Sequence, residues 1–437
     1  MNRSSLFCTM RKGKQATDPR GTFMKYVHVS AAVPEDVPAL FSKRRRVLPG
    51  QQAQKYNRLL GTGFLKNGFD IVMLSQVPLG FKDAPFRLVA PENKHDKGLD
   101  YRFIGFLNVP VLKNICAYAG SRRFVKKVIK QYGAANVRLT CDLLSLSAAM
   151  GAVDAASKYG ALALGIITDL PEHMSGRTST GLYGRFFLRC VRKTSGLITV
   201  TRSIGERFDK PFTVIEGIAT PSGPTPGTET LPNSEALDID RTASLVCDFE
   251  NAYRVDFSKE KVFFYAGGIE KSYGVKLMVN AFIKAGIPDS RLVLCGGGSF
   301  ADELSETAEN DRRIVFAGIK SNSVVTALEK RSFLLINPRT SEGEFTAFSF
   351  PSKNLEYMSS GTPMAGFMLP GIPDGYRELM FIPADETEDS LAELLAKLAD
   401  LPPDEVRQKG LAAADYVLKN KSPEAQARAV EAFFDDL

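Results

Sequence analysis

Residues 348–363 read FSFPSKNLEYMSSGTP, and this stretch predicts a short helix whose first turn holds an anion. Pro351 and Ser352 suit a helix start, and the glycine and proline that close the stretch suit its end. Lys353 would lie in the first turn, where the helix macrodipole disfavours a cation unless an anion such as a diphosphate is bound. Glu356 would follow on the same face, where it can accept hydrogen bonds from sugar hydroxyls. An exposed helix with an ordinary Lys353–Glu356 ion pair explains the same residues equally well.

The 437-residue chain is long enough for two domains, and 44% hydrophobic with 24% charged residues is typical of soluble globular proteins. Its six cysteines include no CxxC pair, so neither a zinc site nor a disulfide framework is indicated. No apolar run has the length of a membrane-spanning helix, and residues 1–23 lack the apolar core of a signal peptide. We expect a cytoplasmic enzyme in which residues 1–23 are a disordered tail or precede the true start.

Three basic clusters contribute to the net charge of +7, namely KRRR at 43–46, SRRFVKKVIKQ at 121–131 and FFLRCVRK at 186–193. The second and third alternate cations with apolar residues, as do helices that rest on anionic lipid. A solvated helix face over an apolar core explains any one cluster as well, but three in one half favour a membrane surface. The charge is moderate and no recognition signature is evident, so no nucleic-acid partner is expected.

The chain alternates apolar strands with helices over two stretches, which predicts two Rossmann-like, doubly wound α/β domains with parallel sheets. The first domain spans 24–218, and the pattern restarts with KVFFYAGGI for a second domain over 261–420. Residues 219–260 begin rich in Pro, Ser, Thr and acids, so we predict a linker or insertion there, and residues 421–437 predict a terminal helix. Ligand would bind at the carboxyl ends of the strands, in a central cleft that the two domains face.

Several segments in a fixed order carry a family resemblance. They are QKYNRLL at 54–60, TDLPEHM at 168–174, FYAGGIEKSYGVKLMVNAF at 264–282, LCGGG at 294–298, RIVFAG at 313–318, INPR at 336–339 and FPSKNLEYMSSGTP at 350–363. On these segments the chain resembles glycosyltransferases of family 4 with the two-domain GT-B fold, and most of all those that build bacterial capsular and other surface polysaccharides.

The resemblance implies transfer of a sugar, with retention at the anomeric carbon, from a nucleotide diphospho-sugar to a hydroxyl of a glycan or lipid-linked acceptor. A UDP-sugar is favoured over a GDP-sugar on family frequency alone. No metal and no cofactor besides this co-substrate are expected. The expected localisation is cytoplasmic, with peripheral contact at the inner membrane face.

Glycines end two predicted strands of the second domain. At Gly267 and Gly268 the missing side chains would let backbone N–H groups approach a diphosphate, and Gly296 and Gly298 would leave room for the nucleotide base. Tight turns explain both pairs as well.

Charged residues stand at the same strand ends. Arg339 follows the strand FLLINP, where its guanidinium can pair with phosphate or with a neighbouring acid. Glu344 is a candidate for binding donor-sugar hydroxyls or an exposed loop acid. In the first domain Asp169 and His173 follow a strand: His173 could donate to donor phosphate or sugar hydroxyls, and Asp169 could act as general base or cap a turn.

The chain also departs from the family pattern. Family members often carry an arginine and a lysine in the glycine turn, where this chain has Gly268 and Tyr273. Lys271 or Lys353, assisted by Arg339, would have to supply the lost charge. The glutamate that usually precedes Glu356 by eight residues is replaced by Phe348, and Glu344 is the candidate to compensate for it.

Two alternatives share this architecture. One is a nucleotide-sugar 2-epimerase, which would turn over without an acceptor. The other is a non-catalytic partner subunit that has lost donor-binding residues. A nicotinamide dehydrogenase is disfavoured because the first strand–helix turn lacks GxGxxG.

Overall fold

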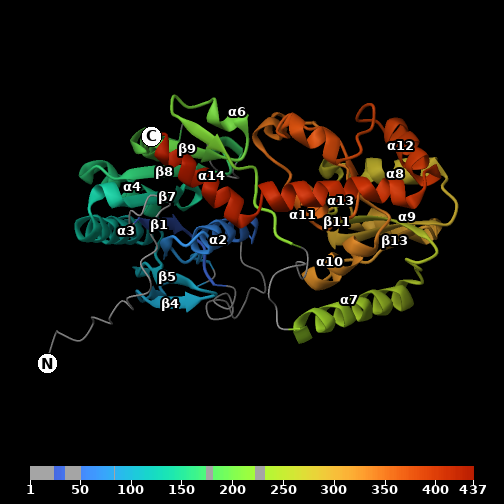
Figure 1. Cartoon of the computed structure of the whole chain (residues 1–437), viewed down its shortest axis with the longest axis horizontal. Coiled ribbons are helices and arrows are strands. Elements are labelled where there is room, and N and C mark those ends of the chain that lie inside the picture. Colours follow the sequence, from blue (N-terminus) through green and yellow to red (C-terminus); the bar gives the residue numbers. More distant parts are fainter. Residues whose placement is uncertain (1–23, 35–50, 83, 174–180, 222–231) are drawn as a thin grey trace. The chain divides into compact units, whose positions relative to one another are not determined.

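The computed structural model describes residues 24–34, 51–82, 84–173, 181–221 and 232–437 (Figure 1). The chain divides into two compact units, which are described separately here. The first unit comprises Met1–Thr199, Gly205–Val214 and Pro423–Leu437, and the second comprises Val200–Ile204 and Ile215–Ser422.

The first unit is built on an eight-stranded sheet in the order β10-β9-β8-β7-β1-β2-β5-β4, in which β4 alone pairs antiparallel. The strands β1, β7 and β8 are almost continuously buried, as expected for a sheet covered on both faces. The order of the strands reverses between β1 and β7, which makes this the topological switch point of the unit. The strands are β1 (Lys25–Ser30), β2 (Asp70–Ser75), β4 (Asn93–Asp96), β5 (Leu99–Phe103), β7 (Val137–Asp142), β8 (Leu162–Ile167), β9 (Gly196–Thr199) and β10 (Phe212–Val214).

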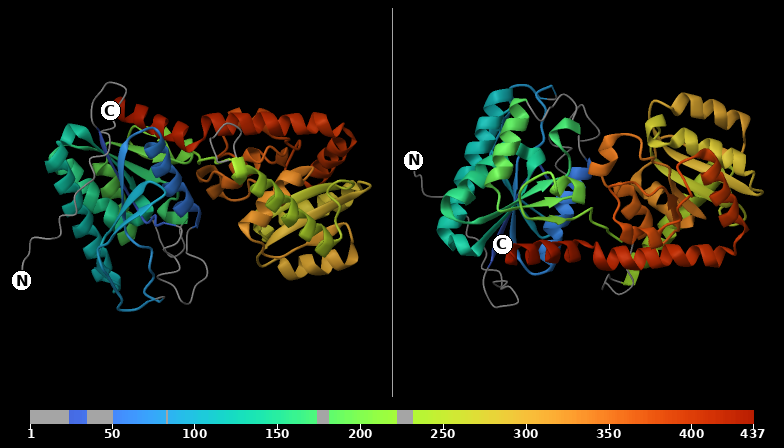
Figure 2. Two further views of the ribbon diagram at one scale, coloured as in Figure 1. Left: turned by 60° about the horizontal axis from the view of Figure 1, so that its bottom comes forward. Right: turned by 90° about the horizontal axis from the view of Figure 1, so that it is seen from above.

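Helices cover both faces of this sheet: α3 to α5 lie on one face and α2 on the other (Figure 2). Helix α4 packs against both α3 and α5, and α14 packs against α2. A side chain at Gly63 of α2 would overlap the Pro423 carbonyl at the start of α14, so glycine there permits the close approach of the two helices. The helices are α2 (Gln51–Lys66), α3 (Pro110–Tyr132), α4 (Leu146–Tyr159), α5 (Leu182–Lys193), the short α6 (Arg202–Gly205) at the boundary of the units, and α14 (Pro423–Asp435).

The second unit is built on a five-stranded parallel sheet in the order β13-β12-β11-β14-β15. This is again a doubly wound order, with its switch point between β11 and β14. The strands are β11 (Lys261–Gly268), β12 (Ser290–Gly297), β13 (Ile314–Phe316), β14 (Leu334–Asn337) and β15 (Met364–Gly366). Its helices are α7 (Pro232–Tyr253), α8 (Val275–Ala285), α9 (Ala301–Asn310), α10 (Asn322–Arg331), α11 (Ser352–Ser359), α12 (Glu388–Asp400) and α13 (Pro403–Asn420).

Two segments differ from the sequence-based expectation. The predicted linker at 219–260 contains α7, whose Val246 and Phe249 are buried in the core of the second unit. These residues and Tyr253 recur at helical spacing, a pattern that the preceding Pro-rich segment obscures. The predicted terminal helix at 421–437 exists as α14, and it packs within the first unit although the second unit immediately precedes it.

No helix among the described residues is long and apolar enough to cross a membrane. The basic cluster at 43–46 lies outside the described residues.

Candidate functional site

The start of helix α11 is fixed at the carboxyl ends of two strands of the second unit. The Tyr357 hydroxyl accepts a hydrogen bond from the backbone N–H of Ala266 in β11 at 3.0 Å. On the other side, the Asn337 side chain at the end of β14 donates to Asn354 Oδ1 at 2.6 Å. Ser352 opens the helix, as predicted, at the switch point between β11 and β14, where doubly wound sheets bind ligands.

Lys353 lies against the end of β11. A Cβ atom built on Gly267 would lie 3.2 Å from Lys353 Cε and 2.6 Å from the Tyr265 hydroxyl oxygen. The Lys353 ammonium is 3.6 Å from Glu356 Oε2, and both side chains remain more than a quarter exposed. The ordinary ion pair is therefore present within α11, but it is long, and the Lys353 side chain lies beside Gly267 at the end of β11.

Arg339 is a partly buried cation without an acidic partner among the described residues. Its Nε atom is buried and has no hydrogen-bond partner there. The guanidinium carbon lies 5.4 Å from the centre of the Tyr273 ring and 5.0 Å from that of Phe345. Burial lowers the pKa of this guanidinium. Two aromatic rings hold the cation, and no acid of the described part of the chain neutralises its charge, which suits it to bind an anion.

The glycines beside this position are required by close backbone packing. Gly296 has a φ of +150°, and a side chain there would overlap the Gly267 carbonyl. A side chain at Gly298 would overlap the Ile269 carbonyl, and one at Gly268 would lie 2.9 Å from the Tyr273 ring. Glycine at these positions lets the ends of β11 and β12 and the following turn meet, whether or not a nucleotide base lies nearby.

Lys271 is engaged elsewhere. Its ammonium forms an ion pair with Glu303 Oε2 of α9 at 2.5 Å, and Lys276 binds the same carboxylate at 2.8 Å. Of the cations considered as substitutes for the missing family residues, Lys353 and Arg339 are the better placed. Glu344 begins the 3-10 helix η5 (Glu344–Phe348), between β14 and α11.

In the first unit the structure reveals a buried polar network at the switch point that the sequence did not predict. His28 Nδ1 lies 2.8 Å from the Thr140 hydroxyl oxygen, and His28 Nε2 lies 2.9 Å from Asn57 Oδ1. Asn57 Nδ2 donates to Asp142 Oδ2 at 2.9 Å, and the Leu144 N–H donates to the other carboxylate oxygen at 3.0 Å. Because Asn57 Oδ1 can only accept, His28 carries its proton on Nε2. Polar residues within otherwise apolar strands are the sequence signal that could have indicated this buried network.

Burial sets the charge of this network. It lowers the pKa of His28 to about 4, despite an opposing hydrogen bond that His28 donates to Asn57. It raises the pKa of Asp142 to about 6, against its hydrogen bonds and with a smaller contribution from the charge of Asp169. His28 is therefore neutral near pH 7.

The remaining predicted residues of the first unit lie near the ends of its strands and in its first helix. Asp169 is exposed in the turn after β8, and His173 ends the 3-10 helix η3 (Pro171–His173). Gln54 of α2 is buried and forms hydrogen bonds with the backbone of Ala31 and Val33.

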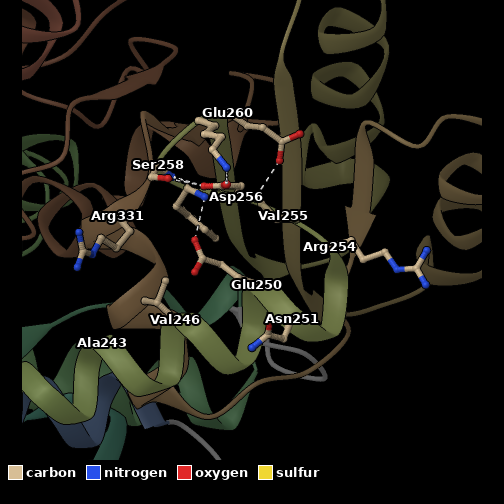
Figure 3. A pocket seen from close by; sticks show the side chains of 12 residues that line it. Ala243, Val246, Glu250, Asn251, Arg254, Val255, Asp256, Ser258, Glu260 and Arg331 are labelled. Carbon is tan, nitrogen blue, oxygen red and sulfur yellow. Dashed lines mark hydrogen bonds and ion pairs between the residues drawn. The ribbon is translucent and has the colours of Figure 1, made fainter.

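A pocket of about 780 Å³ lies away from these residues, between α7 and the loop 254–260 that precedes β11. It is at the amino end of β11, opposite the glycine turn. Figure 3 shows that two acids of the pocket accept hydrogen bonds from the backbone. Glu250 accepts from the Phe257 N–H and Glu260 accepts from the Asp256 N–H, both at 2.9 Å. The geometry offers no reactive group there. No set of three or more His, Cys, Asp or Glu side chains within the described residues is placed to hold a metal.

Comparisons with known proteins bear on the fold and on the second unit. Residues 260–400 match the family model described as "Glycosyl transferases group 1". Similar solved structures include Anabaena HepE in complex with UDP, with 12% identity, 95% of this chain and 100% of that chain covered, and a TM-score of 0.57. Another is the catalytic domain of starch synthase IV from Arabidopsis thaliana bound to ADP and acarbose, with 11% identity, 94% and 99% coverage, and a TM-score of 0.62.

Sucrose-phosphate synthase from Thermosynechococcus elongatus is similar at 14% identity, with 94% of this chain and 98% of that chain covered and a TM-score of 0.58. No curated protein sequence matches the chain. The two doubly wound units and these matches define the GT-B fold, which confirms the predicted fold class. Residues 260–400, which include the sheet of the second unit and helix α11, therefore match a glycosyltransferase group 1 domain.

Proposed function

We propose that the chain is a retaining glycosyltransferase of family 4, which moves a sugar from a nucleotide diphospho-sugar to a hydroxyl of a glycan or lipid-linked acceptor during surface polysaccharide synthesis. The guanidinium of Arg339, which follows β14 and has no acidic partner among the described residues, is the observation that carries this proposal. HepE binds UDP and UDP-glucose, and starch synthase IV binds ADP, which supports a nucleotide donor. UDP is our preferred donor nucleotide over GDP.

Catalysis would be mainly electrostatic. The bond between the anomeric carbon and the diphosphate breaks, and a bond to the acceptor oxygen forms on the same face. The acceptor proton leaves with a phosphate oxygen or through a base, for which Asp169 is the candidate. Arg339, Lys353 and the first N–H groups of α11 stabilise the charge that develops on the diphosphate.

Other residues have supporting roles in this proposal. Glu356 accepts hydrogen bonds from donor hydroxyls. Glu344 assists in sugar recognition, Ser352 contributes a first-turn N–H group, and His173 donates to the donor phosphate or sugar. Because two side-chain cations serve the diphosphate, we expect activity to persist in a chelator.

A transfer assay with a labelled UDP-sugar and a polysaccharide or lipid-linked acceptor tests this function. We expect turnover that requires acceptor and falls by roughly a hundredfold or more in the Lys353→Ala, Glu356→Ala double variant. Unchanged turnover in this variant would contradict the site assignment. Isomerised donor without acceptor would instead indicate the 2-epimerase, and failure to bind any nucleoside diphosphate would indicate a non-catalytic subunit.

A further inference from the structure

Large apolar side chains are exposed together on the first unit. Phe86, Leu88 and Val111 are 70%, 72% and 71% exposed. They belong to a surface that we call the apolar platform, which comprises Phe81, Phe86, Leu88, Val111, Leu112 and Ile115. Apolar patches of this kind commonly mark contact with another molecule or a membrane.

The platform is formed by residues of the loop after β2 and of the start of α3, and backbone and side-chain hydrogen bonds connect these two segments. Strand β3 (Leu88–Val89) pairs antiparallel with β6 (Phe106–Leu107), just before α3. The Phe86 N–H donates to the Asn108 carbonyl at 3.3 Å, and the buried Asn108 side chain donates to the carbonyls of Gly80 and Ala84 at 3.0 and 2.6 Å. These bonds hold both segments side by side.

Phe86 is held in an unusual backbone conformation. Its φ of +56° lies in the left-handed region, which a bulky residue rarely adopts. Its ring meets that of Phe81 edge-on at 5.5 Å, and both rings stay in contact with solvent. Such strain persists only where the surroundings impose it, and it is often associated with function.

The charged residues of helices α3 and α5 have one sign. Helix α3 contains six Lys and Arg residues and no acid, and α5 contains four and no acid. On α3 the side chains of Arg122, Arg123, Lys126 and Lys130 are exposed. These cations are complementary to an anionic surface.

In the cluster 121–131 the apolar residues that the sequence suggested for lipid contact have another role. Val125, Val128 and Ile129 within the cluster 121–131 are buried in the core of the first unit. The apolar residues of this cluster therefore pack into the protein core, while its cations stay exposed. The exposed apolar side chains of α3 lie instead in its first two turns, within the platform.

We propose that the apolar platform inserts into the interface of a bilayer that contains anionic lipid, while the α3 cations bind its headgroups. A bilayer is the occupant because it combines an apolar layer with a surface of negative charge. The inference rests on the proposed function only in that a lipid-linked acceptor would lie in the same membrane. The platform belongs to the first unit and the donor-binding residues to the second, so the two proposals can fail separately.

The chain contains no tryptophan, so a single introduced indole reports on its own site. We would introduce Phe86→Trp or Ile115→Trp, and as a control Ile283→Trp on α8 of the second unit. Vesicles of phosphatidylcholine with phosphatidylglycerol should shift the emission of the two platform variants to the blue, and brominated lipid should quench it. The control should not respond. No shift at the platform, or an equal response of the control, would overturn the proposal.

A second set of variants measures binding directly. Phe86→Asn, which tolerates the left-handed conformation, combined with Leu88→Ser and Ile115→Ser, should lower vesicle cosedimentation roughly tenfold or more. Arg122→Gln, Arg123→Gln and Lys126→Gln should weaken binding to the anionic vesicles and remove its salt dependence. UDP affinity should be unchanged in both. If the wild-type chain instead self-associates through the platform and ignores vesicles, a second copy is the occupant and the proposal is wrong.

Discussion

Arg339 lies against the face of Tyr273, with 5.4 Å between the guanidinium carbon and the ring centre. In the family that the chain resembles, a lysine often occupies the position of Tyr273. Here the aromatic ring holds a cation that comes from the end of another strand. In the site that we propose, the positive charge for a diphosphate would thus come from a residue that follows β14 instead of from the glycine turn.

Substitution at position 273 tests this arrangement. Tyr273→Phe keeps the ring and should leave UDP affinity within about twofold of wild type, whereas Tyr273→Ala should lower it roughly tenfold, as expected for a cation–π contact. Calorimetric titration measures both. Equal affinities for the two variants would show that the ring does not position Arg339.

Removal of the Arg339 charge should have opposite effects on activity and on stability. Arg339→Met should reduce kcat/KM by roughly a hundredfold or more, because a charge-stabilising donor is lost. It should also raise the melting temperature slightly, because a partly buried cation without an acidic partner in the described chain disfavours folding. Arg339→Lys should restore little activity, since lysine lacks the planar fork. A fall in melting temperature along with activity would identify a structural role.

Gly296 and Gly318 form a matched pair for the packing of the strand ends. Both have positive φ, but a side chain at 296 would overlap the Gly267 carbonyl, whereas one at 318 meets nothing within 4 Å. Gly296→Ala should lower the free energy of unfolding by about 3 kcal/mol or more, and Gly318→Ala by about 1 kcal/mol. Denaturant unfolding measures the difference. Similar losses would contradict the packing role of Gly296.

The periodic parts of the chain were predictable from sequence, and the long-range contacts were not. Pro351 and Ser352 predicted the start of α11 because local backbone preferences decide it. From the sequence, Lys271 is a reasonable candidate for a phosphate ligand. In the structure, Glu303 of α9 forms an ion pair with it. Such partners lie far apart in sequence, so no local pattern reveals them.

The same limit applied to buried polar groups. His28 lies within an apolar strand, and its partners Asn57 and Thr140 come from elements distant in sequence. The helix α7 was missed for a different reason, since its apolar spacing is sparse and follows a Pro-rich segment.

The His28–Asp142 network predicts a compensated pH dependence of stability. The folded pKa of His28, about 4, is below its ordinary value of 6.5, so its contribution is complete above pH 6.5 and is lost as the pH falls towards 4. The folded pKa of Asp142, about 6, is above its ordinary 3.8, so its contribution grows as the pH falls through the same range. The two trends oppose each other between about pH 6 and 4.

Removing one group should expose the trend of the other. Asp142→Asn should make the free energy of unfolding fall more steeply between pH 6 and 4 than in the wild type. The contribution of His28, which is lost as the pH falls, is then no longer offset by that of Asp142. His28→Gln should reverse this, with stability relatively improved towards pH 4. Urea unfolding at several pH values checks the slopes, which are independent of the constant loss that each substitution causes. Parallel pH profiles for all three proteins would contradict the network.

The central claim is that Arg339 and Lys353 at the α11 start form a nucleoside-diphosphate site. Calorimetric titration of the wild type and of Arg339→Ala with UDP, in the presence of a chelator, tests it most directly. The account predicts saturable binding to the wild type and at least roughly tenfold weaker binding to the variant. Absence of binding of UDP, GDP or ADP to the wild type, or equal affinity in the variant, would contradict it.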